Sequence, residues 1–197
     1  VIEVSTGAVL GSIETSVKSS AAAPIEVLFV PHSDPPVAYI TNAMAATLAA
    51  AVWNPASQDF EVSEIFDFEA VDANMPLEIY VNRAVDRLYV TTALPGAFHI
   101  FDISGGLLAP KQIAQIPAAG GAHHVAFTPD ERIAYVQNSL LNLPLMSDGS
   151  ITVIDLEAGV VLGNLDTFTS QSLNPNSITA MPDWYHQAGH FNNGPGE

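Results

Sequence analysis

The chain has 197 residues, with 5 basic against 21 acidic side chains and a formal net charge of −16. This charge repels phosphate backbones and anionic lipid, so we expect no nucleic-acid partner and no electrostatic docking to membranes. Because the sequence contains no cysteine, disulfides, thiolate metal ligands and cysteine nucleophiles are excluded. The most apolar run, 44–52, is too short to cross a bilayer. Few lysines and many small polar residues favour an exported protein, periplasmic or extracellular.

The N-terminal residues match a segment near the C-terminus almost position for position. VIEVSTGAVLGSI at 1–13 corresponds to VIDLEAGVVLGNL at 153–165, and Gly7 falls on Gly159. In both, an alternating strand is followed by a turn with a glycine and a second apolar strand. Residues 1–16 are therefore predicted to be the last two strands of a four-stranded unit that lacks its first two, which favours a fragment of a larger protein.

A first complete unit is predicted over 24–70. Its strands are expected at 25–30, 37–41, 47–53 and 60–66. The proline-dense turn 31–36 separates the first two strands, because proline cannot continue a strand ladder. The alanine run 43–51 has helical propensity, but its place between a strand and a turn favours a strand.

Further units follow at 76–118 and 121–168, and another begins at 176–183. The remainder, 184–197, is rich in glycine and asparagine and is predicted to be a loose tail or linker. Asp67, Asp102 and Asp155 recur near strand ends, where aspartate typically binds the backbone of a turn.

The repeat length is measured on the tyrosine of each second strand. Tyr39 and Tyr89 are 50 residues apart, and Tyr89 and Tyr135 are 46 apart. Four strands recurring at this period predict an all-β protein, a β-propeller of four-stranded antiparallel blades. An immunoglobulin-like sandwich, the main competitor, lacks such a regular recurrence. The chain holds about four blades' worth of sequence.

The second strands read AYITN, LYVTT and AYVQN, and the segment FTPDERIAYV precedes the last of them. These segments resemble the YVTN-type propeller repeat over most of the chain, although Asp130-Glu131 replaces the usual Asp-Gly. The resemblance implies a seven-bladed ring in a periplasmic or surface protein. The remainder of that ring, or a protein partner, is then expected to cover the open faces of the blades described here.

His123 and His124 are the leading candidates for chemistry. They lie where a first strand begins, and first strands line the central channel of a propeller. Strand alternation predicts that at most one of them faces the axis. Equivalent positions in other units hold Glu26 and Glu78, so a mixed imidazole and carboxylate site for a cation is one reading. The other reading is an ordinary strand-capping histidine in a polar, water-filled channel.

Other histidines are weaker candidates. His32 lies two residues before Asp34 in a proline-flanked turn and could bind metal or act as a base. His186 and His190 would share a face only if their segment were helical. His99 lies within a strand and is expected to be a packed or an edge histidine.

Two functions are compatible with these patterns. In the first, the chain is part of an exported propeller that acts as a rigid binding platform within a larger assembly. In the second, it is part of a periplasmic propeller oxidoreductase that binds a redox metal, copper first among them, through channel histidines. Propellers that resemble this repeat include copper oxidoreductases of that kind. Whether the chain is an enzyme is left open, because motifs of hydrolases, zincins and phosphate-binding loops are absent from the sequence.

Overall fold

The computed structural model describes residues 1–179, in which the chain forms three four-stranded antiparallel sheets that follow one another in sequence. We call these sheets blades A, B and C. Blade A consists of β1 (Pro24–Phe29), β2 (Val37–Asn42), β3 (Thr47–Asn54) and β4 (Asp59–Asp67). Blade B consists of β5 (Asn74–Val81), β6 (Arg87–Leu94), β7 (Gly96–Asp102) and β8 (Lys111–Pro117). Blade C consists of β9 (Ala122–Phe127), β10 (Ile133–Asn138), β11 (Ile151–Asp155) and β12 (Val160–Leu165).

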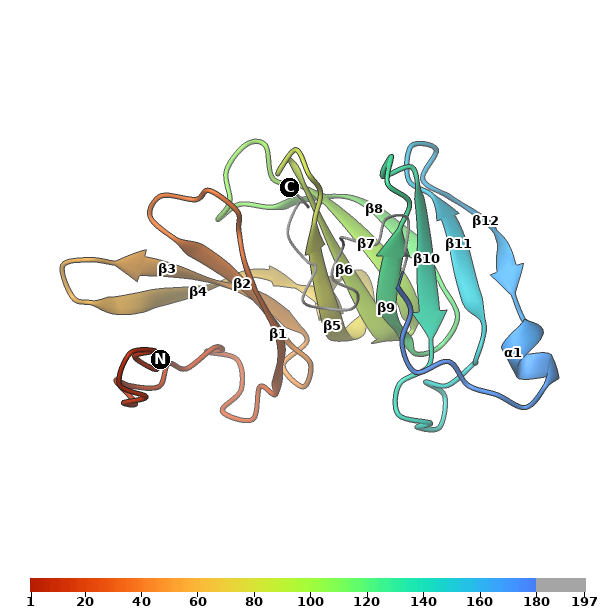
Figure 1. Ribbon diagram of the computed structural model, residues 1–197, viewed down its shortest axis with the longest axis horizontal. Coiled ribbons are helices and arrows are strands. Elements are labelled where there is room, and N and C mark those ends of the chain that lie inside the picture. The colour runs from red at the N-terminus through yellow and green to blue at the C-terminus, as the bar shows by residue number, and fades with distance from the viewer. Residues whose placement is uncertain (180–197) are drawn as a thin grey trace.

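In every blade the strands lie side by side in chain order, and the blades fan out from one end of the molecule to the other (Figure 1). This confirms the predicted all-β architecture of antiparallel blades. Residues 47–51 of the alanine run belong to strand β3, as its position predicted, and all five are buried, whereas 43–46 form the turn between β2 and β3.

The strand-end aspartates hold turns, as expected. The carboxylate of Asp67 accepts the N–H of Glu69 at 3.0 Å, where the short 3₁₀ helix η1 (Phe68–Val71) begins. Asp102 accepts from the N–H of Ser104 at 2.9 Å. These local bonds satisfy backbone donors that the ladder leaves open.

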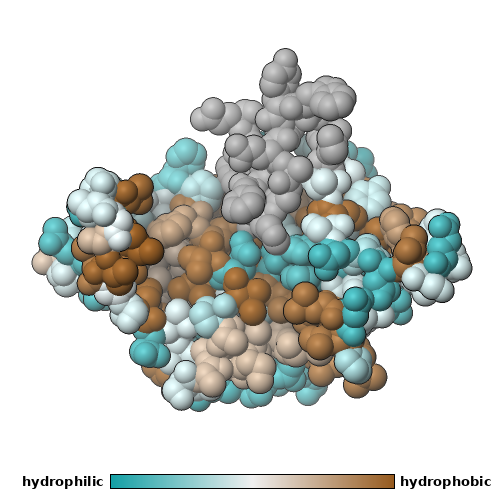
Figure 2. Space-filling view, turned by 60° about the horizontal axis from the view of Figure 1, so that its bottom comes forward, coloured by the Kyte–Doolittle hydropathy of each residue, from teal (hydrophilic) through white to brown (hydrophobic). Residues whose placement is uncertain are grey.

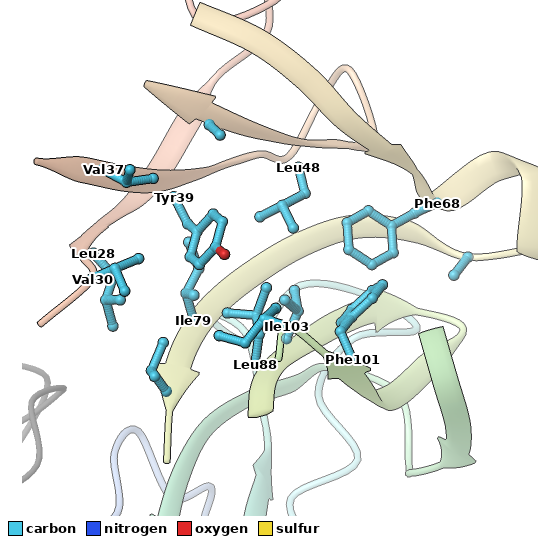
Figure 3. Packing of buried hydrophobic residues seen from close by; sticks show 14 of the residues in the cluster. Leu28, Val30, Val37, Tyr39, Leu48, Phe68, Ile79, Leu88, Phe101 and Ile103 are labelled. Carbon is cyan, nitrogen blue, oxygen red and sulfur yellow. The ribbon is translucent and has the colours of Figure 1, made fainter. Parts of the chain in front are cut away.

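Blades A and B share an apolar interface (Figure 3). Tyr39 and Leu48 of blade A, with Phe68 of η1, face Leu88 and Phe101 of blade B, and all five are essentially fully buried. The hydroxyl of Tyr39 donates to the carbonyl oxygen of Leu107 at 2.8 Å, so the polar end of this side chain is satisfied within the interface.

Blades B and C share a second interface that is richer in aromatic rings. Tyr80, Tyr89 and Phe98 of blade B surround Phe127 of blade C, with ring centroids 5.3 to 6.4 Å from that of Phe127. Such offset and edge-on contacts add to the burial energy of the rings. The interface fixes strands β5 and β9 beside each other, and this pair of strands carries the site described below.

The N-terminal segment covers part of the free face of blade A. Thr15 and Asn42 exchange two hydrogen bonds of 2.8 Å, and Ile13 packs on the buried cluster around Ile40. The prediction of two strands over 1–16 is wrong: this segment forms no regular strand and folds back on itself with one isolated bridge between Ile2 and Val9.

The C-terminal part of the described chain contains the one-turn helix α1 (Thr167–Ser170). The predicted tail 184–197 and the pair His186 and His190 lie outside the described residues, as does part of the predicted blade start 176–183. Among residues 1–179, no helix has the length and apolar character that a membrane span requires.

A candidate metal centre between two blades

The first strand of each blade carries a bulge at the same place. In blade C, Ala122 pairs with Asn138 and Val125 pairs with Val136, so His123 and His124 together face the single residue Gln137. Blades A and B have the same irregularity. Their two-residue bulges are 25–26, opposite Thr41, and 77–78, opposite Thr91. A bulge of this kind redirects side chains at a strand end.

The residue opposite each bulge satisfies one of its backbone donors. The N–H of Glu26 donates to Thr41 Oγ1 and the N–H of Glu78 donates to Thr91 Oγ1, both at 3.2 Å. In blade C, the N–H of His124 donates to Gln137 Oε1 at 3.4 Å. The repeated threonine of the second strand is thus an acceptor for the bulge, and glutamine takes its place in blade C.

Both bulge histidines of blade C reach the same carboxylate of blade B. Glu78 Oε1 lies 3.2 Å from His123 Nε2 and 3.5 Å from His124 Nδ1. The two imidazole rings stack, with centroids 3.8 Å apart and planes inclined by 27°. The prediction that at most one of the pair faces the axis assumed regular alternation, which the bulge breaks, so that both histidines approach the same carboxylate.

The three side chains lie in a shielded environment. Glu78 is 2% exposed and His124 is 7% exposed, while His123 is partly buried. Burial raises the pKa of the neighbouring Tyr80 hydroxyl well above its ordinary value, and the charge of Glu78 raises it further. Tyr80 therefore stays protonated and neutral beside the carboxylate at any physiological pH.

This geometry suits a transition-metal ion. One ligand atom from each of Glu78, His123 and His124 lies within 4.8 Å of the other two. Nitrogen and oxygen ligands about 2.1 Å from a tetrahedral ion stand about 3.4 Å apart, close to the distances to Glu78 Oε1. Two imidazoles and one carboxylate are also a donor set that binds zinc, copper or iron and leaves coordination positions open.

The other predicted ligands lie elsewhere. Among the described residues, neither Glu26 nor His32 belongs to the group. Glu26 occupies the equivalent bulge of blade A, and the exposed His32 lies in the turn at the opposite end of β1. Two residues whose side chains bind the backbone beside the site were not predicted, Tyr80 at Val125 and Gln137 at His124. Gln137 was visible as the exception to threonine in the repeated second strand.

His99 is a core histidine, the packed one of the two alternatives expected. Its Nε2 lies 3.0 Å from Thr92 Oγ1, and its Nδ1 lies 3.0 Å from Gln112 Nε2. Because an amide nitrogen only donates, Nδ1 accepts and Nε2 carries the proton. Burial lowers the pKa of His99 to about 4, so the ring is neutral.

The fold has counterparts among solved structures. The chain aligns with hydrazine synthase of Kuenenia stuttgartiensis at a TM-score of 0.61 and 19% identity, covering 88% of this chain and 43% of that chain. The periplasmic gluconolactonase PpgL of Pseudomonas aeruginosa aligns at 0.57 and 15%, covering 75% and 40%. The β-propeller domain of Cps50 (Swd1) from Myceliophteria thermophila aligns at 0.50 and 9%, covering 73% and 41%.

These likenesses establish the fold, which is part of a β-propeller. The chain spans about two fifths of the length of these structures. No protein-family model and no curated protein matches the sequence.

Proposed function

We propose that this chain is part of an exported β-propeller protein that binds a divalent transition metal through Glu78, His123 and His124. The observation that carries the proposal is the convergence of both bulge histidines on one buried carboxylate across the interface of blades B and C. Taking a carboxylate out of water is costly unless cations or strong donors surround it, and a metal ion held by three ligands provides that compensation.

The donor set supports copper or another redox-active ion as the occupant. Histidine nitrogens are suitable ligands for copper, zinc and iron, and two histidines with one carboxylate bind iron in oxygenases. Three protein ligands leave room for a further ligand, as in catalytic rather than structural sites. A periplasmic oxidoreductase is therefore the enzymatic form of this proposal, and the position of the site at the inner strands of two blades would place it beside the channel of a closed ring.

Metal analysis of the purified full-length protein tests the proposal. We expect one equivalent of Cu²⁺ or Zn²⁺ in the unaltered protein after incubation with the metal and removal of the excess. His124→Ala and Glu78→Gln should lose it. His32→Ala is the matched control, because it removes an exposed histidine outside the group. No bound metal in the unaltered protein, or equal binding by His124→Ala, would refute the proposal.

A platform for protein binding is the second candidate. Alternate residues of β1 present an apolar row to solvent, with Val27 54% and Phe29 56% exposed, and every residue of β12 is exposed. Figure 2 shows apolar surface at both ends of the row of blades. Such faces need a cover, either from the remaining blades of the same protein or from a partner protein.

Light scattering of the full-length protein distinguishes whether its own remaining blades or a partner protein bury these faces. A monomer whose mass is unchanged by dilution indicates that its own remaining blades complete the ring. Association that Phe29→Lys abolishes indicates a protein partner at the free face of blade A.

A further inference from the structure

The backbone of the histidine pair is held from two sides by side chains outside the candidate ligand set. The N–H of Val125, next to His124, donates to the hydroxyl oxygen of Tyr80 at 2.9 Å. The N–H of His124 itself donates to Gln137 Oε1. Two successive backbone donors are thus bound by two different elements, β5 of the preceding blade and β10 of the same blade.

Tyr80 connects blade B to blade C beside the site, through contacts of its hydroxyl and its ring with strand β9. It belongs to the same strand as Glu78, two residues further on, and its ring packs on Phe127 with centroids 5.3 Å apart. The side chain is 8% exposed. One rigid strand therefore supplies the carboxylate of the site and a hydrogen bond to the strand that supplies its histidines.

The side chain of Gln137 is also held in place by hydrogen bonds. Its amide nitrogen donates to the carbonyl oxygens of Ser139 at 2.8 Å and of Pro175 at 2.6 Å, and the side chain is fully buried. With the nitrogen engaged, Oε1 faces the N–H of His124. The hydrogen bond to Gln137 thus holds the backbone of His124 in the position from which its side chain reaches Glu78.

We infer that Tyr80 and Gln137 are positioning residues for the His123 and His124 pair, an inference that rests on the proposed metal-binding function. Ligand atoms must be held to within about 0.5 Å of their productive positions. Loss of groups that orient ligands typically weakens metal binding about 10-fold to 100-fold. Neither residue belongs to the candidate ligand group, so both would act only through the placement of the histidines.

Tyr80→Phe removes one hydroxyl and leaves the ring. Tyr39→Phe is its matched control, because the hydroxyl of Tyr39 also forms a hydrogen bond with the backbone between two blades, away from the site. We expect the dissociation constant for Cu²⁺ or Zn²⁺ to rise about 10-fold or more in Tyr80→Phe and less than about twofold in Tyr39→Phe. Gln137→Ala should weaken binding similarly. Gln137→Thr should restore part of it, because threonine is the acceptor at the equivalent positions Thr41 and Thr91.

A measurement without metal keeps this inference separate from the proposed function. The stacked rings of His123 and His124 shift each other's imidazole NMR signals, so movement of the bulge changes those signals. We expect such changes in metal-free Tyr80→Phe but not in Tyr39→Phe. Absence of metal binding in the unaltered protein would refute the proposed function and leave the NMR result to decide the positioning role. Equal imidazole signals and equal affinities in the two tyrosine variants would overturn the inference.

Discussion

The hydroxyl of Thr41 donates a hydrogen bond of 2.5 Å to the carbonyl oxygen of Leu77, which joins the second strand of blade A to the bulge of blade B. The hydroxyl oxygen of Thr41 also accepts a hydrogen bond of 3.2 Å from the N–H of Glu26 in its own blade. Thr41 is completely buried. One side chain thus links the bulges of two consecutive blades.

Thr41→Val keeps the shape of this side chain but removes its hydroxyl. We expect the free energy of unfolding to fall by about 1–3 kcal/mol, since a buried donor and a buried acceptor lose their bond to the hydroxyl. Urea denaturation followed by fluorescence gives this value. Thr167→Val, on an exposed turn of α1, should change it by less than about 0.5 kcal/mol. Equal stabilities of the two variants would contradict the role of Thr41.

Gly121→Ala tests the entry to the strand that carries the histidines. Gly121 has a φ of +88°, and a Cβ atom there would lie 2.0 Å from the carbonyl oxygen of Met146. Because backbone must move to relieve this contact, we expect a loss of about 2 kcal/mol or more in unfolding free energy. Gly105→Ala is the control, since its Cβ would meet no atom within 4 Å. If both variants melt at the same temperature, the close approach of this loop is not present in solution.

Because His99 is buried and neutral, we expect the free energy of unfolding to fall in mild acid. Its pKa is about 4 in the folded chain and about 6.5 in an unfolded chain. As the pH falls from about 6.5 towards 4, the unfolded chain takes up a proton that the folded chain refuses, so this group lowers stability by up to about 3 kcal/mol. His99→Gln has no such titration. Its unfolding free energy should therefore fall less than that of the unaltered protein between pH 7 and pH 4.5. Parallel pH profiles would show that His99 is not neutral and buried.

Metal should raise stability only through the site. At a free Zn²⁺ or Cu²⁺ concentration about 100 times the dissociation constant, a ligand that binds only the folded state adds about 2.7 kcal/mol. We expect this gain in the unaltered protein and in His32→Ala, and its loss in His123→Ala. Thermal melts with and without a chelator measure it. An equal gain in His123→Ala would place the bound metal elsewhere.

The repeated patterns of the sequence predicted the blades well, because the strands and turns of a blade are determined by residues close together in the sequence. Alternating strands, proline-rich turns and the recurring tyrosine at Tyr39, Tyr89 and Tyr135 each depend on neighbouring residues alone. The assignment of the alanine run to a strand was correct for 47–51, which lie in β3 between β2 and β4 of the sheet, while 43–46 form the turn before it. Context outweighed helical propensity there.

The candidate site was only partly predictable, because it depends on register. Equivalence of His123-His124 to the positions of Glu26 and Glu78 was readable from the repeat. Which of these carboxylates meets the histidines was not, since it depends on how consecutive blades pack. The bulge was also hidden, because a sequence does not reveal that two residues face one across a ladder. Only the glutamine in AYVQN marked blade C as different.

The recurring bulge has a consequence for how such a protein can change. In each blade, two neighbouring side chains occupy the bulge of the first strand, while a hydrogen bond to the second strand holds their backbone in place. The pairs are Ile25-Glu26, Leu77-Glu78 and His123-His124, three different chemistries on one backbone arrangement. Substitution of two residues in one blade can therefore create or erase a binding group without altering a single strand. The three blades thus offer equivalent positions at which side chains can be exchanged, and two adjacent ones differ enough to combine a carboxylate with two imidazoles.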